Sequence, residues 1–518
     1  PADKAVLSNC IFDGIVYSYD YIAGGLVGLI VGPNVKIDNC LNDGTVYAGH
    51  GGRLSSVVGY FEGASASAVF TNVYTTGRLY KLDGSETRKE NMESSGNIDV
   101  ADRFTGGYTP LSAEELKGKK AYVNTELDFW SNTNASGIWA AIEGTSPEIR
   151  KLSTAEGQID NFDGVVKLDY DWYYEALEAN PGAEHITFEI ATISELAALA
   201  KLVNGGTESF AGHTVKLTSP VYDFNPDWVA GEPFPEDGNV WMPVGKDNNI
   251  FKGTFTGEYQ EGGSAVIRGI YVEAASQYIG LFGDVWGNIQ NLKLENSVIS
   301  STQSFTGGIV GRLWSGNVKN IFVADTVTVK NSAAVAGGIV GRFSYGRDTD
   351  QNIIRGGRIS NCWFAGEVIG NTRVGGIVGQ IMWTSGDGIV MDNCLFNGIV
   401  RATDGSAGGL VGHNWDNSTL QYCVSNGRVC SDAAENVGAV VGESNITGVA
   451  VYAIEKVFKN DGTAENMASN KAGYKAMTEA QLTGIKAYEN TDLDFYWKDR
   501  NEGGIWTAIT DAGPELKQ

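Results

Sequence analysis

Four histidines, six cysteines and 62 acidic residues are the side chains with which this chain of 518 residues could carry out metal or nucleophilic chemistry. The histidines are isolated from one another in the sequence: His50, His185, His213 and His413. None lies in an HExxH zinc motif, and the chain has no G-x-S-x-G motif, P-loop or G-x-G-x-x-G motif. His413 is the best placed because it follows a glycine-rich strand, yet we interpret it as a solvated turn residue. We therefore expect a protein that is not an enzyme and that uses no metal or other cofactor.

One enzymatic alternative stays open, because parallel β-helices also host polysaccharide lyases and hydrolases that work with paired carboxylates on the outer face. Asp392 and Asp416 are one pair that could meet in this way. Asp128 and Asp494 recur in a repeated LDF segment, which we interpret as a structural motif at the end of each copy. The acidic GKDNN segment at Gly245 matches no calcium-loop pattern.

Aromatic residues recur three or four positions after the last glycine of a repeated strand: Trp286, Trp314, Tyr345, Trp383 and Trp415. If the repeats stack in register, these rings form a column with one ring about every 5 Å. Aromatic faces bind the C–H faces of sugars and bind cations, so the column is a candidate ligand-binding stripe. The alternative is that the rings pack beneath the turns and only stabilise them. The first copy of the repeat carries Leu29 and Tyr60 instead.

Two repeated phrases predict the elements that would position these residues. The first is glycine-rich: GGLVGLIVG from Gly24, GGIVGRLWSG from Gly307, GGIVGRFSYG from Gly337, GGIVGQIMWTSG from Gly375 and GGLVGHNWDN from Gly408. In the second copy, equivalent glycines recur every 28 to 38 residues, at Gly283, Gly311, Gly341, Gly379, Gly412 and Gly442. Short segments rich in Val, Ile, Phe and Thr alternate with polar residues, which is typical of strands. The pattern predicts a mostly β fold, a right-handed parallel β-helix with coils of about 30 residues and a few short capping helices.

The second phrase aligns into columns. One column holds asparagine, which we expect to form a hydrogen-bonded ladder from coil to coil: Asn9, Asn39, Asn72, Asn291, Asn320, Asn361 and Asn393, interrupted by Tyr422. A glycine column is predicted to mark a left-handed turn: Gly14, Gly44, Gly77, Gly366, Gly398 and Gly427, with Asn296 and Asp325 as substitutes. A third column mixes cysteine with aliphatic residues and is predicted to face the core: Cys10, Cys40, Cys362, Cys394 and Cys423 with Val73, Leu292 and Ile321. Cys430 lies outside it.

A larger duplication divides the chain. AYVNTELDFW at Ala121 matches AYENTDLDFY at Ala487, and GIWAAI at Gly137 matches GIWTAI at Gly504. We predict the C-terminal part of a first domain at 1–152, a connector at 153–185 and a complete second domain at 186–518. The second domain opens with a helix that Thr192 and Glu195 cap and that stops at Gly205. The first copy lacks an equivalent opening, so we expect about 200 further residues before it.

Charge narrows the range of partners. The formal net charge is −24 and the pI is about 4.6. Nucleic acids and anionic membrane surfaces require clustered Lys and Arg, so we expect neither as a partner. The sequence has no stretch of 18 apolar residues, so we expect no membrane insertion.

The glycine-rich phrase followed by x-Asn-Cys and Gly-x-Val resembles the GLUG-motif repeats of bacterial surface proteins. The opening helix, the WMPVG and FKGTF segments and the closing LDF and Trp segments are similar to the usual frame of such domains. Many members are secreted or outer-surface, adhesin-like proteins of gut Bacteroidota, and the motif also occurs in proteins called immunoglobulin A peptidases. The resemblance implies an extracellular protein, secreted or anchored at the outer membrane. We expect it to bind a glycan, or a host or bacterial surface protein, along the solenoid face. The alternatives are a polysaccharide-active enzyme and a structural stalk.

Overall fold

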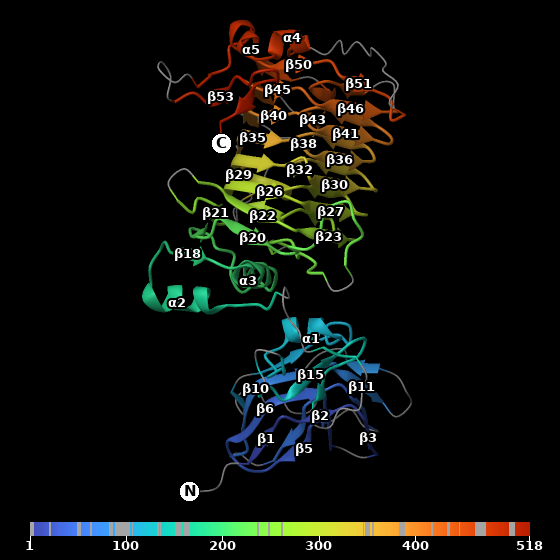
Figure 1. The fold of residues 1–518 in the computed structure, drawn as a ribbon. Coiled ribbons are helices and arrows are strands. Elements are labelled where there is room, and N and C mark those ends of the chain that lie inside the picture. Colours follow the sequence, from blue (N-terminus) through green and yellow to red (C-terminus); the bar gives the residue numbers. More distant parts are fainter. Residues whose placement is uncertain are drawn as a thin grey trace. The chain divides into compact units, whose positions relative to one another are not determined.

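The computed structural model consists of two compact units, Pro1–Lys167 and Leu168–Gln518, each built mainly from stacked strands (Figure 1). The strands form a parallel β-solenoid with about 30 residues per turn, which confirms the predicted architecture. The division between the units lies within the residues predicted to be the connector. The structure describes residues 5–19, 22–48, 53–62, 65–81, 86–88, 104–105, 107–131, 134, 136–150, 157–159, 166–235, 238–246, 249–260, 263–344, 346–347, 353–354, 357–382, 389–415, 418–432, 436–444, 446–461, 473–496 and 503–517.

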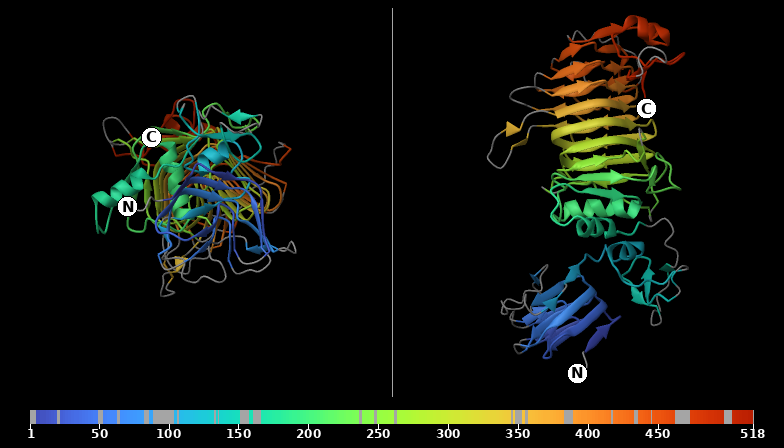
Figure 2. Two further views of the ribbon diagram at one scale, coloured as in Figure 1. Left: turned by 90° about the horizontal axis from the view of Figure 1, so that it is seen from below. Right: turned by 90° about the vertical axis from the view of Figure 1, so that its left-hand side faces the viewer.

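The second unit stacks its coils so that equivalent strands pair in parallel (Figure 2). One stack contains β23 (Tyr271–Ala274), β27 (Ser297–Ser301), β30 (Val327–Asn331), β36 (Glu367–Gly370), β41 (Ile399–Ala402), β46 (Arg428–Ser431) and β51 (Val457–Phe458). The next contains β24 (Tyr278–Ile279), β28 (Phe305–Gly307), β31 (Val335–Gly337), β37 (Arg373–Gly375), β42 (Ser406–Gly408) and β47 (Val437–Gly438).

The remaining strands of these coils form one large sheet that bends around the solenoid. Its members are β18 (Thr187–Ile190), β19 (Thr214–Leu217), β20 (Val221–Asp223), β21 (Thr254–Thr256), β22 (Ala265–Arg268), β25 (Phe282–Trp286), β26 (Asn288–Glu295), β29 (Val310–Val323), β32 (Val340–Phe343), β35 (Gly357–Phe364), β38 (Val378–Ile381), β39 (Val390–Asp392), β40 (Leu395–Phe396), β43 (Val411–Asn414), β44 (Thr419–Gln421), β45 (Val424–Ser425), β48 (Val441–Glu443), β49 (Thr447–Val449), β50 (Tyr452–Ile454) and β52 (Lys475–Met477). Two short pairs stand apart: β33 (Gly346–Arg347) with β34 (Ile353–Ile354), and β53 (Trp506–Thr507) with β54 (Glu515–Leu516).

The first unit contains the same kind of coil. Its larger sheet has β1 (Val6–Ser8), β2 (Ile11–Phe12), β6 (Val35–Asn42), β10 (Ala68–Thr75), β13 (Phe104–Thr105) and β14 (Tyr108–Pro110), and a second has β3 (Ile15–Ser18), β7 (Thr45–Ala48), β11 (Arg78–Lys81) and β12 (Glu86–Arg88). Smaller sheets are formed by β4 (Ile22–Gly24) with β8 (Arg53–Ser55), β5 (Val27–Ile30) with β9 (Val58–Phe61), and β15 (Trp139–Ile142) with β16 (Glu148–Ile149) and β17 (Gln158–Ile159).

The cysteine column faces the core, as predicted. Register pairs Leu292 with Ile321 and Ile321 with Cys362, and each of the three is almost completely buried. Cys40, Cys394 and Cys423 are also buried, whereas Cys10 is half-buried, and all six cysteines are free thiols. The thiols therefore pack as small apolar groups. Cys430, which the column left unassigned, is buried in β46.

The left-handed turn lies at the asparagine column, and the prediction that placed it at the glycine column is wrong. Every asparagine of the column has a positive φ of 48–59°, and Tyr422 has φ 52°. Of the predicted glycine column, only Gly77 and the substitute Asn296 have positive φ. Asparagine tolerates this conformation, so the residue that forms the ladder also makes the turn. The glycines serve close packing instead, because a Cβ at Gly398 would collide with the carbonyl oxygen of Gly366 in the next coil.

Two helices lie at the N-terminal end of the second unit: α2 (Asp171–Ala179) and α3 (Ile193–Asn204). In α3, Thr192 and Glu195 form the predicted capping box, and the helix ends before Gly205. Helix α2 falls within the residues predicted to be the connector, and its Trp172 stacks on Phe210, 6.2 Å away between ring centroids.

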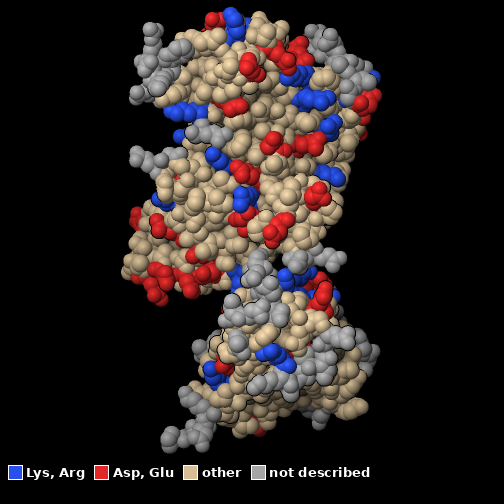
Figure 3. Space-filling model, viewed as in Figure 1, with Lys and Arg blue, Asp and Glu red and all other residues tan. Residues whose placement is uncertain are grey.

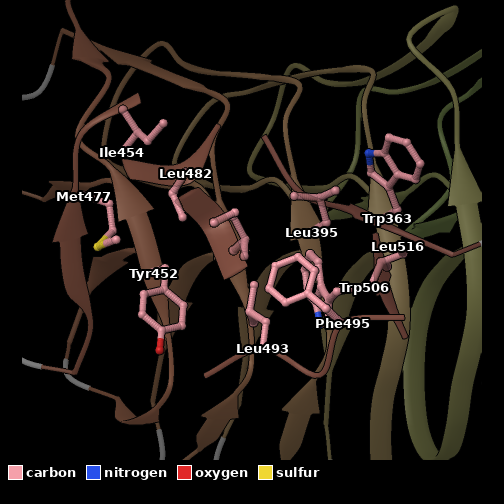
Figure 4. Close-up of a cluster of buried hydrophobic side chains, with 12 residues drawn as sticks. Trp363, Leu395, Tyr452, Ile454, Met477, Leu482, Leu493, Phe495, Trp506 and Leu516 are labelled. Atoms are coloured by element: carbon pink, nitrogen blue, oxygen red, sulfur yellow. The ribbon is translucent and has the colours of Figure 1, made fainter. Parts of the chain in front are cut away.

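The closing segment of the second unit packs against the outside of the solenoid. Register aligns an outward-facing column along the coils: Phe322, Trp363, Leu395, Val424 and Tyr452. Apolar side chains of the closing segment cover this column (Figure 4): Leu482, Leu493, Phe495, Trp506 and Leu516. The segment contains α4 (Glu479–Leu482) and α5 (Ile485–Asn490). The described residues of the closing segment, 479–496 and 503–517, therefore form a lateral cover over several coils.

The first unit closes in the same way, with Leu41 and Tyr74 covered by residues around α1 (Lys119–Asn124). The Tyr74 hydroxyl accepts a hydrogen bond from the Glu126 backbone at 2.6 Å, and the Tyr452 hydroxyl accepts the equivalent bond from Asp492 at 2.8 Å. The two closing segments thus share one local structure, which explains why their sequences repeat.

Candidate ligand-binding surfaces

The strand that follows each glycine-rich corner carries one polar position on every coil. Register aligns Asp284, Arg312, Arg342, Gln380, His413 and Glu443 on β25, β29, β32, β38, β43 and β48. The neighbouring stack aligns Tyr278, Phe305, Val335, Arg373 and Ser406. Polar, cationic and aromatic side chains therefore run side by side along the solenoid.

At one end of this row, the Arg312 guanidinium contacts one carboxylate and two aromatic rings. Its guanidinium forms two hydrogen bonds with the Asp284 carboxylate, one of them 2.9 Å long from Nε, and the exposed fractions of the two side chains are 12% and 2%. The guanidinium also lies over two rings, 3.6 Å from the Tyr278 centroid and 4.0 Å from that of Trp314. The Arg312 guanidinium therefore covers one face of the Trp314 ring.

Trp286 and Trp314 do not share one position of the register. A bulge between Val285 and Trp286 places Trp286 opposite Ser315, while Val285 stays opposite Leu313. The two indoles are therefore offset, and the regular one-ring-per-coil spacing does not hold at this pair. Tyr345 and Trp383 lie outside the described residues, so a column across these coils stays a prediction.

Trp415 is the most exposed of the predicted aromatic residues that the structure describes, with 46% of its surface exposed. Its ring stacks on the His413 imidazole, with 4.8 Å between centroids and 14° between planes. Arg373 Nε and Glu443 Oε2 approach the same atom, His413 Nδ1, at 3.1 and 3.0 Å. His413 is nearly buried, so its predicted role as a solvated turn residue is wrong. A planar ring, a guanidinium and a carboxylate thus lie together at this end of the row.

A groove that no sequence pattern predicts lies on the neighbouring face, where β26, β29 and β35 meet the closing segment. The groove has a volume of about 540 Å³. Its floor includes the ladder residues Asn291, Asn320 and Asn361, and Lys293, Lys319 and Lys517 line it together with Glu258. One wall belongs to residues 503–505 and 516–517, and sequence spacing does not show that this segment folds back here.

The ladder on the floor of the groove is the one predicted from the repeats. Asn361 Nδ2 donates to Asn320 Oδ1 at 3.0 Å, Asn320 Nδ2 donates to Asn291 Oδ1 at 2.7 Å, and the series continues to Thr256 Oγ1 at 3.0 Å. In the first unit, Asn72 donates to Asn39 at 2.9 Å. Phe322 and Trp363 add two rings beside the ladder, 4.6 Å apart between centroids.

A further aromatic column, also unforeseen, lies in the first unit. Tyr17, Tyr47 and Tyr80 occupy one register position on β3, β7 and β11 and stack at 4.8 and 5.4 Å between centroids. Rings stacked face to face present their edges to solvent, so this column offers a poorer platform than one exposed ring face.

Other residues considered for catalysis or metal binding form ion pairs or hydrogen bonds within the fold, where the structure describes them. Asp392 pairs with Arg358 at 2.6 Å, whereas Asp416 and His50 lie outside the described residues. His213 Nδ1 accepts from the Ile186 backbone at 3.1 Å, and the Asp494 carbonyl accepts from Trp506 at 2.9 Å. Across the described ranges, no group of three or more His, Cys, Asp or Glu side chains could hold a metal ion. None of the helices in those ranges is long and apolar enough to cross a membrane.

Comparison with known proteins adds one similar structure. No protein-family model matches the chain, and no curated protein matches it. A solved structure, described as that of a candidate immunoglobulin A1 protease from Bacteroides ovatus, aligns with 64% of this chain and 92% of its own length. The two are 20% identical, with a TM-score of 0.46. That description belongs to the other protein and assigns no activity to this chain.

Proposed function

We propose that this chain is an extracellular, adhesin-like repeat protein that binds glycans on the lateral surface of its solenoid and does not act as an enzyme. The observation that carries the proposal is the exposed Trp415 ring stacked on His413, whose imidazole also contacts Arg373 and Glu443. An indole face packs well against the apolar face of a sugar, while a guanidinium and a carboxylate can hydrogen-bond to its hydroxyls.

The rigid setting of Trp415 supports this role. Its backbone nitrogen donates to the Ile381 carbonyl at 3.0 Å, and its ring is stacked on His413. A ring that is already held in place loses little conformational freedom when a ligand binds, which favours affinity. The repeated coils then supply length and a continuous surface, as the adhesin-like interpretation of the sequence requires.

A glycan-array screen of the full chain tests the proposal, with Trp415→Ala as the variant. The control is Tyr174→Ala, which removes another exposed aromatic side chain from α2. We expect the native chain and the control to bind the same glycans, and Trp415→Ala to lose binding of the uncharged glycans among them at unchanged melting temperature.

Other outcomes would contradict the proposal. An array with no bound glycan would favour the structural stalk. Shortening of a bound glycan during incubation, measured as new reducing or unsaturated ends, would favour the polysaccharide-active enzyme.

A further inference from the structure

We infer that the groove between the solenoid and the closing segment is a second binding site, for a carboxylated oligosaccharide. This site lies on β26, β29 and β35, whereas Trp415 follows β43. The inference rests on the lining of the groove and does not depend on binding at Trp415.

The charge of the groove indicates an anionic ligand. Among the residues that the structure describes, Lys293, Lys319 and Lys517 line it together with the carboxylate of Glu258, although the whole chain carries a net charge of −24. Acidic side chains of the second unit gather over α2, whereas Lys and Arg side chains lie interspersed with acidic ones over the middle coils (Figure 3). A local excess of ammonium groups in a partly enclosed groove attracts carboxylates more strongly than the same charges would on an open surface.

The spacing of the polar groups favours a saccharide. Asn291, Asn320 and Asn361 repeat once per coil, and Lys319 lies beside Gln290 on the adjacent coil. Coils are about 4.8 Å apart, close to the length of one pyranose unit in a chain. An extended peptide places same-side residues about 6.8 Å apart, so an acidic peptide would lose register with the coils.

The amide groups and rings fit the rest of a sugar. Each ladder Nδ2 uses one hydrogen in the ladder, and an amide nitrogen carries two, so the second can be donated to a hydroxyl or carboxylate. The partly buried Phe322 and Ile505 supply apolar surface in the same groove, whereas Trp363 lies almost entirely beneath the closing segment. Trp363 is fixed by donation from Nε1 to Asn397 Oδ1 at 2.8 Å. Cations, amides and rings together match a ligand with carboxylates, hydroxyls and apolar ring faces.

The test is calorimetric titration of the full chain with a galacturonic acid tetramer at low salt. We expect saturable binding that weakens as salt is added, and much weaker binding of the fully methyl-esterified tetramer. The double variant Lys319→Gln/Lys517→Gln should lower the affinity by roughly tenfold or more, since each lost charge-assisted hydrogen bond costs a comparable factor.

A matched control removes the same charge elsewhere, from Lys201 in α3 and Lys330 in β30, both replaced by Gln. The control should retain the native affinity. Equal binding of the acid and the ester, or an equal loss in the control, would overturn the inference. Tighter binding of a glutamate tetramer than of the uronate would assign the groove to acidic peptides. Trp415→Ala should leave uronate binding unchanged, so the proposals for the two binding sites can be tested separately.

Discussion

Asn320 donates its side-chain amide to Asn291 in the neighbouring coil at 2.7 Å while its own backbone is left-handed, with φ 54°. One residue type therefore satisfies two requirements at every coil: it makes the turn, and it ties that turn to the next coil. This double role explains why asparagine recurs at the column although several residue types can fill the neighbouring positions.

The two roles of Asn320 can be separated by substitution. Asn320→Gly keeps the left-handed conformation and loses the ladder bonds, so we expect a loss of about 1 kcal/mol in the free energy of unfolding. Asn320→Ala also strains the turn and should lose a further ~1–2 kcal/mol. Urea unfolding measures both changes. Equal stability of the two variants would show that the backbone conformation contributes nothing.

Gly338 allows two coils to approach closely. A Cβ there would collide with the Gly376 carbonyl oxygen and the Phe364 ring, so Gly338→Ala should cost about 3 kcal/mol or more. Gly28 lies in an open part of the first unit, where an added Cβ meets no atom within 4 Å. Gly28→Ala should leave the thermal unfolding transition of its unit unchanged, and a loss as large as that in Gly338→Ala would contradict the packing argument.

The hydroxyl of Tyr452 connects the lateral cover to the coils. Tyr452→Phe removes its bond from the Asp492 backbone and its bond to the Asp492 carboxylate, 3.0 Å long. We expect a loss of about 1–2 kcal/mol and faster amide exchange in α5. The matched variant Tyr74→Phe should act on the first unit alone, where the same hydroxyl accepts from Glu126. Unchanged exchange in α5 would show that the contact does not hold the cover.

The Asp284–Arg312 ion pair is buried, so the changes in stability caused by substituting its two residues should not be additive. Asp284→Ala leaves a guanidinium without its counter-charge and should destabilise the second unit by about 3–5 kcal/mol. The double variant Asp284→Ala/Arg312→Met removes both charges and should recover much of that loss. A double-mutant cycle in urea measures the coupling, and simple additivity of the two single variants would contradict it.

The buried thiols should be unreactive in the folded protein. Burial raises the pKa of Cys40 to about 11 and raises the pKa of Cys394 and Cys423 well above that of a free thiol. The thiolate is the nucleophile, so at pH 8 little of it exists at these residues. We expect a thiol reagent to label them slowly in buffer and rapidly in guanidinium chloride. Rapid labelling of Cys394 in buffer, located by peptide mapping, would contradict the core assignment.

The fold could be predicted from the sequence because equivalent residues of successive repeats stack on one another. Aligning the phrases was enough to place Leu292, Ile321 and Cys362 in one core column, and the structure pairs them. The same alignment misassigned the left-handed turn, because glycine is the usual residue there and asparagine is the less common substitute. The residue types in an alignment column show that few side chains are tolerated at that position. Only the backbone structure shows whether a positive φ or close packing is the reason.

The binding surfaces were harder to predict. The aromatic spacing assumed an unbroken register, and the bulge at Val285–Trp286 displaces Trp286 from the position of Trp314. The groove requires Lys517 and Lys319 to line the same cavity, although nearly two hundred residues separate them in the sequence. No local sequence pattern predicts this groove, because it forms only where the closing segment folds back along the outer face of the solenoid.

The lateral cover also determines how the second unit would respond to mechanical load. A pull applied to the closing segment would reach the solenoid through the buried cluster that its side chains form with Trp363, Leu395 and Tyr452, which belong to different coils. The load is therefore distributed in shear across several coils before the last coil can peel away. A strand attached only to the last coil would instead open one pair of strands at a time, as a zipper does.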